Sequence, residues 1–351
     1  MLANCVKSSV NILRGTTEAE RKTLNRRCRN GELHRVHPNT FMPTTEWSTL
    51  DATGRRRVTH LTAVDSREDM VVVGRSAALA WGLEIFDRRI ADAELRSHAA
   101  DPDPEVNNDI IELAHPTRRR YETRGLVHER KLGWGPEDLR RVDGRPVTSV
   151  GATVADIMLR HGLDHGLVAA DSALRAGHSA IELARSANRS TNPRRALQTV
   201  AYATQFADSA AESILRAQII EAGLPAPEVQ LRVFRADKVL IGYVDLGFPG
   251  HLAMIEVHGK GKFLGAYGDP GERSYREWRR ESELIAEGLA VLRVTWEEIL
   301  SGEALRRIRE LLVAQRAKIA AGARTTARFV GAGERWPDGY RTRRVRGNDA
   351  A

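Results

Sequence analysis

Cysteine is almost absent from this sequence, which contains only Cys5 and Cys28. The pair lacks the spacing of zinc ligands, and no second pair exists to build a disulfide framework. This scarcity excludes a cysteine-based zinc finger and is typical of proteins kept in a reducing compartment. Long apolar runs are also missing: the opening MLANCVKSSVNILRG lacks the core of a signal peptide, and no stretch has the ~18 apolar residues of a membrane span. We expect a cytoplasmic protein with no membrane partner.

Lysine is the second scarce residue type. It occurs only at Lys7, Lys22, Lys131, Lys238, Lys260, Lys262 and Lys318, so arginine carries most of the positive charge behind the formal net charge of +8. Such an excess favours polyanionic partners, chiefly DNA. Arginine in place of lysine is also typical of a GC-rich genome, so the composition alone does not settle the partner.

The length of 351 residues is enough for two or three hydrophobic cores. We expect an α+β multidomain protein in four parts. Residues 1–48 are predicted to be a winged-helix-like DNA-binding unit, 49–190 a mixed α/β and then helical middle region, 191–321 an α/β domain, and 322–351 a flexible basic tail.

The first part contains a strongly basic helix. Thr16 or Thr17 can cap it, Gly31 ends it, and Leu24 faces inward. Two short strands joined by a turn follow, and a basic helix with a basic hairpin is the outline of a winged helix-turn-helix. An ordinary helix with a solvated basic face is the alternative that periodicity leaves open. The expected DNA contacts are Arg21, Lys22, Arg26, Arg27, Arg29, His34 and Arg35.

Histidines in the middle region carry no predicted chemistry. His161, His165 and His178 are spread over two helical segments without an acidic partner at ligand spacing, so we predict surface or cap roles for them. Residues 91–107 are polar and rich in Asp and Pro, which predicts a surface loop.

Three carboxylates carry the chemistry predicted for residues 191–321. Asp245 lies near the end of one predicted strand and Glu256 near the end of the next, within reach across a hairpin. Glu212, in the first turn of the preceding helix, can supply a third group. Carboxylate oxygens suit Mg²⁺ or Mn²⁺, which activates water and neutralises charge during phosphodiester hydrolysis. We predict these three residues as catalytic metal ligands; a sheet edge with two charged strand ends is the alternative.

The segment IEVHGKGKF places cations beside Glu256. Lys260 or Lys262 can orient the attacking water or offset charge on the phosphoryl oxygens, and the intervening glycines leave room for a DNA backbone. His258 is expected to take a secondary catalytic role, since an imidazole is only partly charged near neutral pH.

These motifs resemble two known families. Glu212, VDLGF with Asp245, IEVHGKGKF and the closing EGLAVLRVTWEEIL resemble the PD-(D/E)XK nuclease superfamily, and within it the branch similar to the very-short-patch-repair endonuclease. The basic helix and hairpin, GRSAALAWGL and RVDGRPVTSVGATVADI resemble the amino-terminal portion of AbiEi-type antitoxin-like proteins, which carry a winged-helix domain and commonly repress their own operon. His258 departs from both nuclease patterns, since the superfamily has lysine there and the branch usually aspartate. A metal ligand, a general base and a sign that catalysis has lapsed are the alternatives for this residue.

Three hypotheses follow. The first is a DNA-binding protein with a Mg²⁺- or Mn²⁺-dependent endonuclease domain, which the resemblances place in a bacterial defence or toxin–antitoxin context. The second, implied by the amino-terminal resemblance, is an antitoxin and autorepressor with an inactive nuclease-like domain and a cognate toxin as partner. The third is a basic scaffold that binds DNA without sequence preference. A homodimer is common among winged-helix proteins, but no heptad or apolar stripe compels one here.

Overall fold

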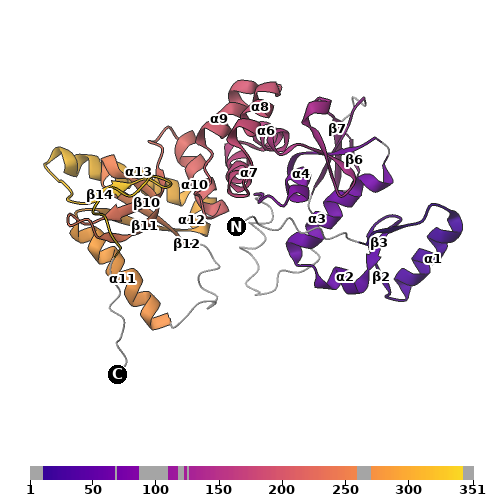
Figure 1. The fold of residues 1–351 in the computed structure, drawn as a ribbon, viewed down its shortest axis with the longest axis horizontal. Coiled ribbons are helices and arrows are strands. Elements are labelled where there is room, and N and C mark those ends of the chain that lie inside the picture. The colour runs from indigo at the N-terminus through magenta and orange to yellow at the C-terminus, as the bar shows by residue number, and fades with distance from the viewer. Residues whose placement is uncertain are drawn as a thin grey trace. The chain divides into compact units, whose positions relative to one another are not determined.

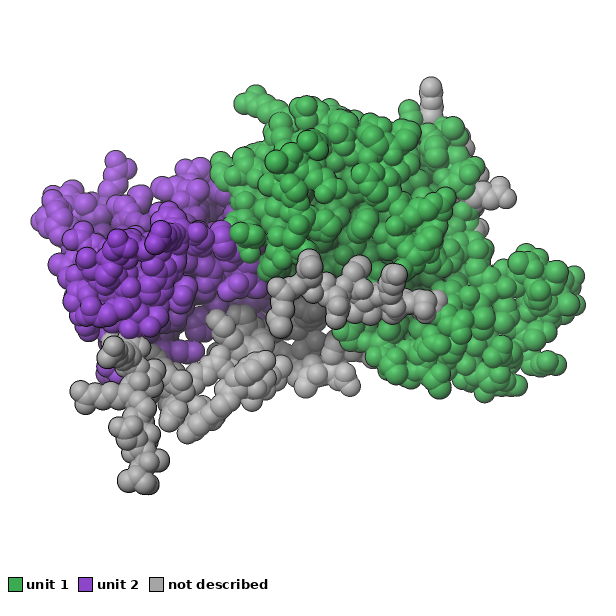
Figure 2. All heavy atoms as spheres, viewed as in Figure 1, with its two compact units in different colours: residues 1–205 green, residues 206–351 purple. Residues whose placement is uncertain are grey.

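The computed structural model describes residues 11–67, 69–86, 110–117, 122–124, 126–258 and 270–342 (Figure 1). The chain divides into two compact units, residues 1–205 and 206–351 (Figure 2). The described residues form three β-sheets and twelve α-helices, in agreement with the predicted α+β class. None of the helices in these ranges is long and apolar enough to cross a membrane.

The first unit begins with a small three-stranded sheet and a basic helix. The sheet has the order β1-β3-β2, and its strands are β1 (Leu13–Arg14), β2 (Leu33–His37) and β3 (Thr40–Pro43). Helix α1 (Glu18–Arg29) starts with a capping box in which Thr17 accepts from the backbone of Glu20 and the Glu20 side chain accepts from the backbone of Thr17. Leu24, Leu33 and Phe41 form the core that holds the helix against the hairpin.

A six-stranded mixed sheet follows in the same unit. Helices α2 (Thr44–Thr49) and α3 (Ala52–Thr62) lead into it, and α4 (Gly74–Trp81) packs against α3 and β5. The sheet order is β6-β7-β5-β4-β9-β8. Its strands are β4 (Val71–Val72), β5 (Ile111–His115), β6 (Glu122–Arg124), β7 (Val127–Lys131), β8 (Leu139–Val142) and β9 (Arg145–Thr148).

A group of helices completes the first unit (Figure 1). It consists of α6 (Val150–His161), α7 (Leu163–Arg175), α8 (Ala180–Arg189) and α9 (Pro193–Tyr202). Helix α6 packs against the other three and against α4. Gly151 permits this close approach, because a Cβ there would lie 2.6 Å from Ser186 Oγ of α8. Asp138, only 1% exposed, accepts hydrogen bonds from Ser186 and Arg189 and so ties the end of α8 to the sheet.

The second unit is a five-stranded sheet with helices packed against it. The order is β13-β12-β11-β10-β14, and every pairing is antiparallel except that of β12 with β13. Leu231, Val244, Met254 and Leu284 lie in its main hydrophobic cluster. The elements are α10 (Ala210–Glu221), β10 (Glu228–Phe234), β11 (Leu240–Phe248), β12 (Ala253–His258), α11 (Pro270–Ala286), β13 (Ala290–Thr295), α12 (Trp296–Ser301), α13 (Glu303–Ala320) and β14 (Arg328–Val330).

Residues 322–342 were expected to belong to a flexible basic tail, but in the structure they pack against the rest of the second unit. Strand β14 pairs with β10. Beyond it, the rings of Trp336 and Tyr340 lie 5.2 and 4.8 Å from the ring of Phe234, which is fully buried. Two aromatic side chains thus supply the apolar contact that fixes a segment without sequence periodicity.

Candidate functional site

The basic face of α1 is formed by Lys22, Arg26 and Arg29. These side chains are exposed and recur every three or four residues, so they share the side of the helix opposite Leu24. Lys22 makes a 2.8 Å ion pair with Glu18. Because both partners are largely exposed, that pair is weak and leaves Lys22 able to exchange it for another anion.

Two other arginines predicted as DNA contacts are engaged within the unit. Arg21 Nε donates to the carbonyl oxygen of Gly15 at 3.2 Å. Arg27 Nε donates to Glu32 Oε2 at 2.9 Å, which joins the end of α1 to the start of the hairpin. Both side chains therefore help to position the basic face.

The hairpin brings Arg35 to the same face, whereas His34 makes an aromatic contact. Arg35 donates to Asn25, which lies between Lys22 and Arg29 on the helix surface. His34 instead stacks on Trp47, with ring centroids 4.1 Å apart. Burial, and then the nearby charge of Arg55, lowers the pKa of His34, so this imidazole is neutral at pH 7 and suits a stacking role.

The turn of the hairpin is tied to the start of α1. Asn39 has φ +61°, in the left-handed region that asparagine tolerates. Its side-chain nitrogen donates to the Gly15 carbonyl oxygen at 2.8 Å, and the Gly15 N–H donates back to Asn39 Oδ1 at 3.2 Å. This reciprocal pair fixes the hairpin relative to the basic helix.

In the second unit, Glu212 serves as part of a helix cap. Ser209 Oγ donates to Glu212 Oε1 at 2.8 Å, and the Asp208 N–H donates to Oε2 at 3.1 Å. The side chain is 4% exposed, and burial, followed by the charge of Asp245, raises the pKa of Glu212 above its usual value. A carboxyl group that holds its proton more tightly and already caps a helix is a weaker metal ligand.

Asp245 is linked to Glu212 by the side chain of Gln230, a residue with no functional signal in the sequence. Gln230 Nε2 lies 3.2 Å from Glu212 Oε2 and 3.3 Å from Asp245 Oδ1, so one amide bridges the two carboxyl groups. Asp245 Oδ2 accepts from the backbone N–H of Val257 at 2.7 Å. The carboxylate on β11 is therefore bonded to the residue that follows Glu256 on β12.

Glu256 is paired with α11. Its side chain is 6% exposed, and Arg280 Nη2 donates to Glu256 Oε2 at 2.9 Å. Arg280 Nη1 also donates to the Tyr243 carbonyl oxygen at 3.0 Å. His258 is half-buried at the end of β12. Lys260 and Lys262 lie outside the described residues.

The three predicted metal ligands have different hydrogen-bond partners. Glu212 and Asp245 share Gln230, whereas Glu256 is held by Arg280. Within the described ranges, no group of three or more His, Cys, Asp or Glu side chains is placed to hold a metal ion. The Mg²⁺ or Mn²⁺ site therefore stays a prediction, and the two lysines expected beside it fall outside those ranges.

A buried network of charges lies in the first unit, where the sequence indicated no chemistry. Glu112 of β5 accepts from the Arg75 backbone N–H at 3.1 Å, and His161 Nε2 lies 2.9 Å from Glu112 Oε1. Burial raises the pKa of this carboxyl group, but the hydrogen bond and charge of His161 and the charges of Arg75 and Arg130 outweigh it and lower the pKa of Glu112 to about 2. His161 thus has an acidic partner, which the spacing of residues in the sequence did not indicate.

A second carboxylate of this network, Asp156 of α6, is held by two arginines. Arg130 of β7 donates to one of its oxygens, and Arg160 Nε donates to Oδ1 at 3.1 Å. The signal that was available in the sequence is Asp156 followed four residues later by Arg160, but Arg130 is distant in sequence and reaches Asp156 only through the fold.

Comparison of the chain with known protein families, curated proteins and solved structures finds no match.

Proposed function

We propose that the protein binds double-stranded DNA through the exposed face of α1, with Lys22, Arg26 and Arg29 against the major groove and its phosphates. The observation that carries this proposal is that some basic residues of α1 are exposed, whereas others are bonded within the unit. Three of them share one exposed helix face, whereas Arg21 and Arg27 make internal contacts that support it. The adjacent hairpin, with Arg35 on the same side, would contact the neighbouring phosphate backbone.

The second unit then has the role of a scaffold in an antitoxin-like autorepressor. The ion pair between Glu256 and Arg280 and the capping role of Glu212 both support a unit that does not need a metal ion to fold. The resemblance of the amino-terminal segments to AbiEi-type antitoxin-like proteins implies the protein's own promoter as the DNA and a cognate toxin as the partner.

Fluorescence anisotropy with labelled duplexes tests DNA binding. A set of fragments from the promoter of the protein's own gene is compared with unrelated DNA over a range of salt concentrations. The double variant Arg26→Ala/Arg29→Ala should weaken binding and reduce the magnitude of the salt slope by about 2, roughly one per lost phosphate contact.

A matched control removes the same charge elsewhere. Arg309 and Arg316 are exposed on α13 in the second unit, so Arg309→Ala/Arg316→Ala should leave affinity and salt slope near the wild-type values. Equal losses in the two double variants would mean that net charge, not the α1 face, drives binding. Loss of affinity without loss of discrimination between promoter and unrelated DNA would favour a non-specific scaffold.

The second candidate function is a metal-dependent endonuclease. The hydrogen bond between Asp245 Oδ2 and the Val257 N–H favours it, because it places one predicted ligand next to the strand that carries Glu256. Plasmid nicking is measured with Mg²⁺ or Mn²⁺ for wild type, Asp245→Ala and Glu256→Ala, with Asp237→Ala, an exposed carboxylate in the same unit, as the control. Metal-dependent nicking that both site variants lose would support catalysis; nicking unchanged by either, or none at all, would remove it.

A further inference from the structure

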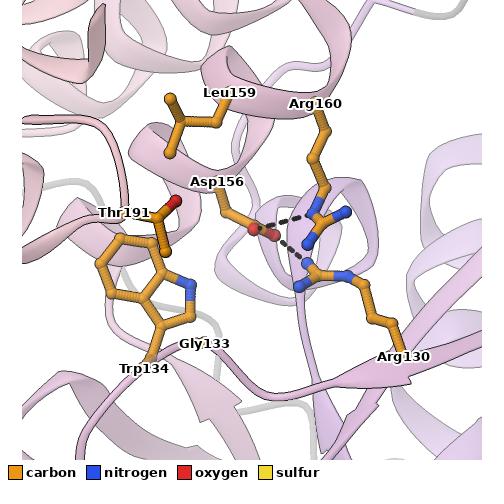
Figure 3. A pocket seen from close by; sticks show the side chains of 7 residues that line it. All are labelled: Arg130, Gly133, Trp134, Asp156, Leu159, Arg160 and Thr191. Carbon is orange, nitrogen blue, oxygen red and sulfur yellow. Dashed lines mark hydrogen bonds and ion pairs between the residues drawn. The ribbon is translucent and has the colours of Figure 1, made fainter. Parts of the chain in front are cut away.

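A cavity of about 230 Å³ lies within the first unit, between the sheet and the helices. Its walls come from β7, the loop after it, α6 and the turn between α8 and α9. Figure 3 shows the guanidinium groups of Arg130 and Arg160 converging on Asp156, with the indole of Trp134 on the facing wall. The residues that matter for the argument are Arg130, Trp134, Asp156, Leu159, Arg160 and Thr191.

Arg130 is the residue that indicates a ligand. Its side chain is only 6% exposed, and one terminal nitrogen donates to Asp156. The other, Nη1, is buried and has no hydrogen-bond partner among the described residues. A buried charged donor left without an acceptor has lost its hydration without compensation, so native structures rarely retain one unless something else binds it.

The charges that line the cavity also suit an anion. Arg130 and Arg160 both donate to Asp156, so two guanidinium groups converge on one carboxylate at the cavity wall. An anion in the cavity would complete the hydrogen bonding of Arg130.

We propose that this cavity binds a small oxyanion, a phosphate or carboxylate group on a compact molecule. Arg130 Nη1 and the guanidinium of Arg160 would donate to its oxygens, as arginine does in anion sites. Trp134 and Leu159 supply apolar walls for the body of the ligand, and Thr191 lies at the exposed rim. The cavity volume is below the ~300–1,000 Å³ of sites for drug-sized ligands, which favours a small molecule over a nucleotide.

Isothermal titration of the full chain with sodium phosphate and with sodium acetate, at constant ionic strength maintained with sodium chloride, tests the proposal. Saturable binding of either anion supports an oxyanion site, and the anion that binds more tightly identifies its source chemistry. Arg160→Gln should weaken that binding at least tenfold through loss of a charge-assisted hydrogen bond. Arg160 is 35% exposed, so its replacement should leave the fold intact.

Two further variants keep the result decisive. Thr191→Trp places a bulky side chain at the exposed rim and should block binding without touching the buried charges. Arg26→Ala/Arg29→Ala, which alters the basic face of α1, should bind the anion as wild type does, so failure of the DNA proposal and failure of this one are separable. No saturable heat with either anion, or binding unchanged in both Arg160→Gln and Thr191→Trp, would overturn the site.

Discussion

Arg280 of α11 donates a hydrogen bond to Glu256 of β12, with 2.9 Å between Arg280 Nη2 and Glu256 Oε2. The carboxylate is 6% exposed and the arginine 32% exposed, so one partner is buried and the other reaches solvent. A buried carboxylate keeps its charge only when a cation or several donors offset the loss of water. In this structure the guanidinium of Arg280 supplies that compensating charge.

The first prediction concerns this pair. Arg280→Leu leaves the buried carboxylate of Glu256 without its cation and should lower the free energy of unfolding by about 2–3 kcal/mol. The double variant Arg280→Leu/Glu256→Leu should recover much of that loss, because a buried ion pair is often no more stable than an apolar one. Urea unfolding of wild type, both single variants and the double variant gives the coupling energy, expected at about 1–3 kcal/mol. Strict additivity would mean that the two side chains do not interact.

The second prediction concerns the glycines at the two ends of α4, Gly74 as its first residue and Gly82 as its C-cap. Gly74, at the start of α4, has φ +56°, and a Cβ there would lie 1.6 Å from Glu112 Oε2. Gly74→Ala should therefore displace the Glu112 carboxylate and destabilise the first unit by about 3 kcal/mol or more.

Gly82, at the end of the same helix, is the control for that variant. It also has positive φ, +73°, but a Cβ there meets nothing within 4 Å. Gly82→Ala should show only the conformational penalty, about 1 kcal/mol. Thermal or urea unfolding separates the two effects, and equal losses would assign the whole Gly74 effect to backbone conformation.

The third prediction is an acid transition governed by Glu112. Its pKa is about 2 in the folded protein, below the ~4.3 of an unfolded chain. The stabilisation from ionised Glu112 is fully present above pH ~4.3 and is lost as pH falls toward 2, by about 3 kcal/mol in all. Glu112→Gln should lower stability at pH 7 and flatten the pH dependence between pH 5 and 2. Glu137→Gln, in an exposed carboxyl of the same unit, should leave the slope unchanged.

The fourth prediction concerns Glu212, whose contribution to stability changes with pH in the opposite direction to that of Glu112. Burial and Asp245 raise its pKa, so the folded state binds this proton more tightly than the unfolded chain does. Its favourable contribution is present at low pH and is lost as pH rises through the raised pKa. Relative to wild type, Glu212→Gln should gain stability between pH 4 and 8, as measured by urea unfolding at each pH. A difference that does not change with pH would mean that Glu212 has an ordinary pKa.

Local sequence patterns predicted some elements of the fold. The capping residues around α1 and the turn between the two short strands after it predicted those elements, because each signal lies within a few neighbouring residues. Strand β14 had no such signal: its pairing with β10 depends on residues about a hundred positions away. Periodicity has no means of detecting a contact of that range.

The candidate sites show the same limit. The pattern predicted that Asp245 and Glu256 lie on neighbouring strands, which the structure confirms. It did not predict Gln230 between Glu212 and Asp245, because that bridge depends on the register of β10 against β11 and on the left-handed φ of +47° at Gln230. Nor did it predict Arg280 beside Glu256 or Arg130 beside Asp156, since both partners come from other elements. Charge compensation inside a core is a property of the assembled fold.

The pairing of β14 with β10 determines which truncated forms of this protein will resist aggregation. A fragment ending before residue 328 would leave the N–H and C=O groups of Arg232, Val233 and Phe234 open to a neighbouring molecule. An unprotected strand of this kind recruits other chains into intermolecular sheets. When the second unit is expressed on its own, the fragment should therefore include residues through 342. Strand β14 then covers the edge of β10, and the rings of Trp336 and Tyr340 keep their contacts with Phe234.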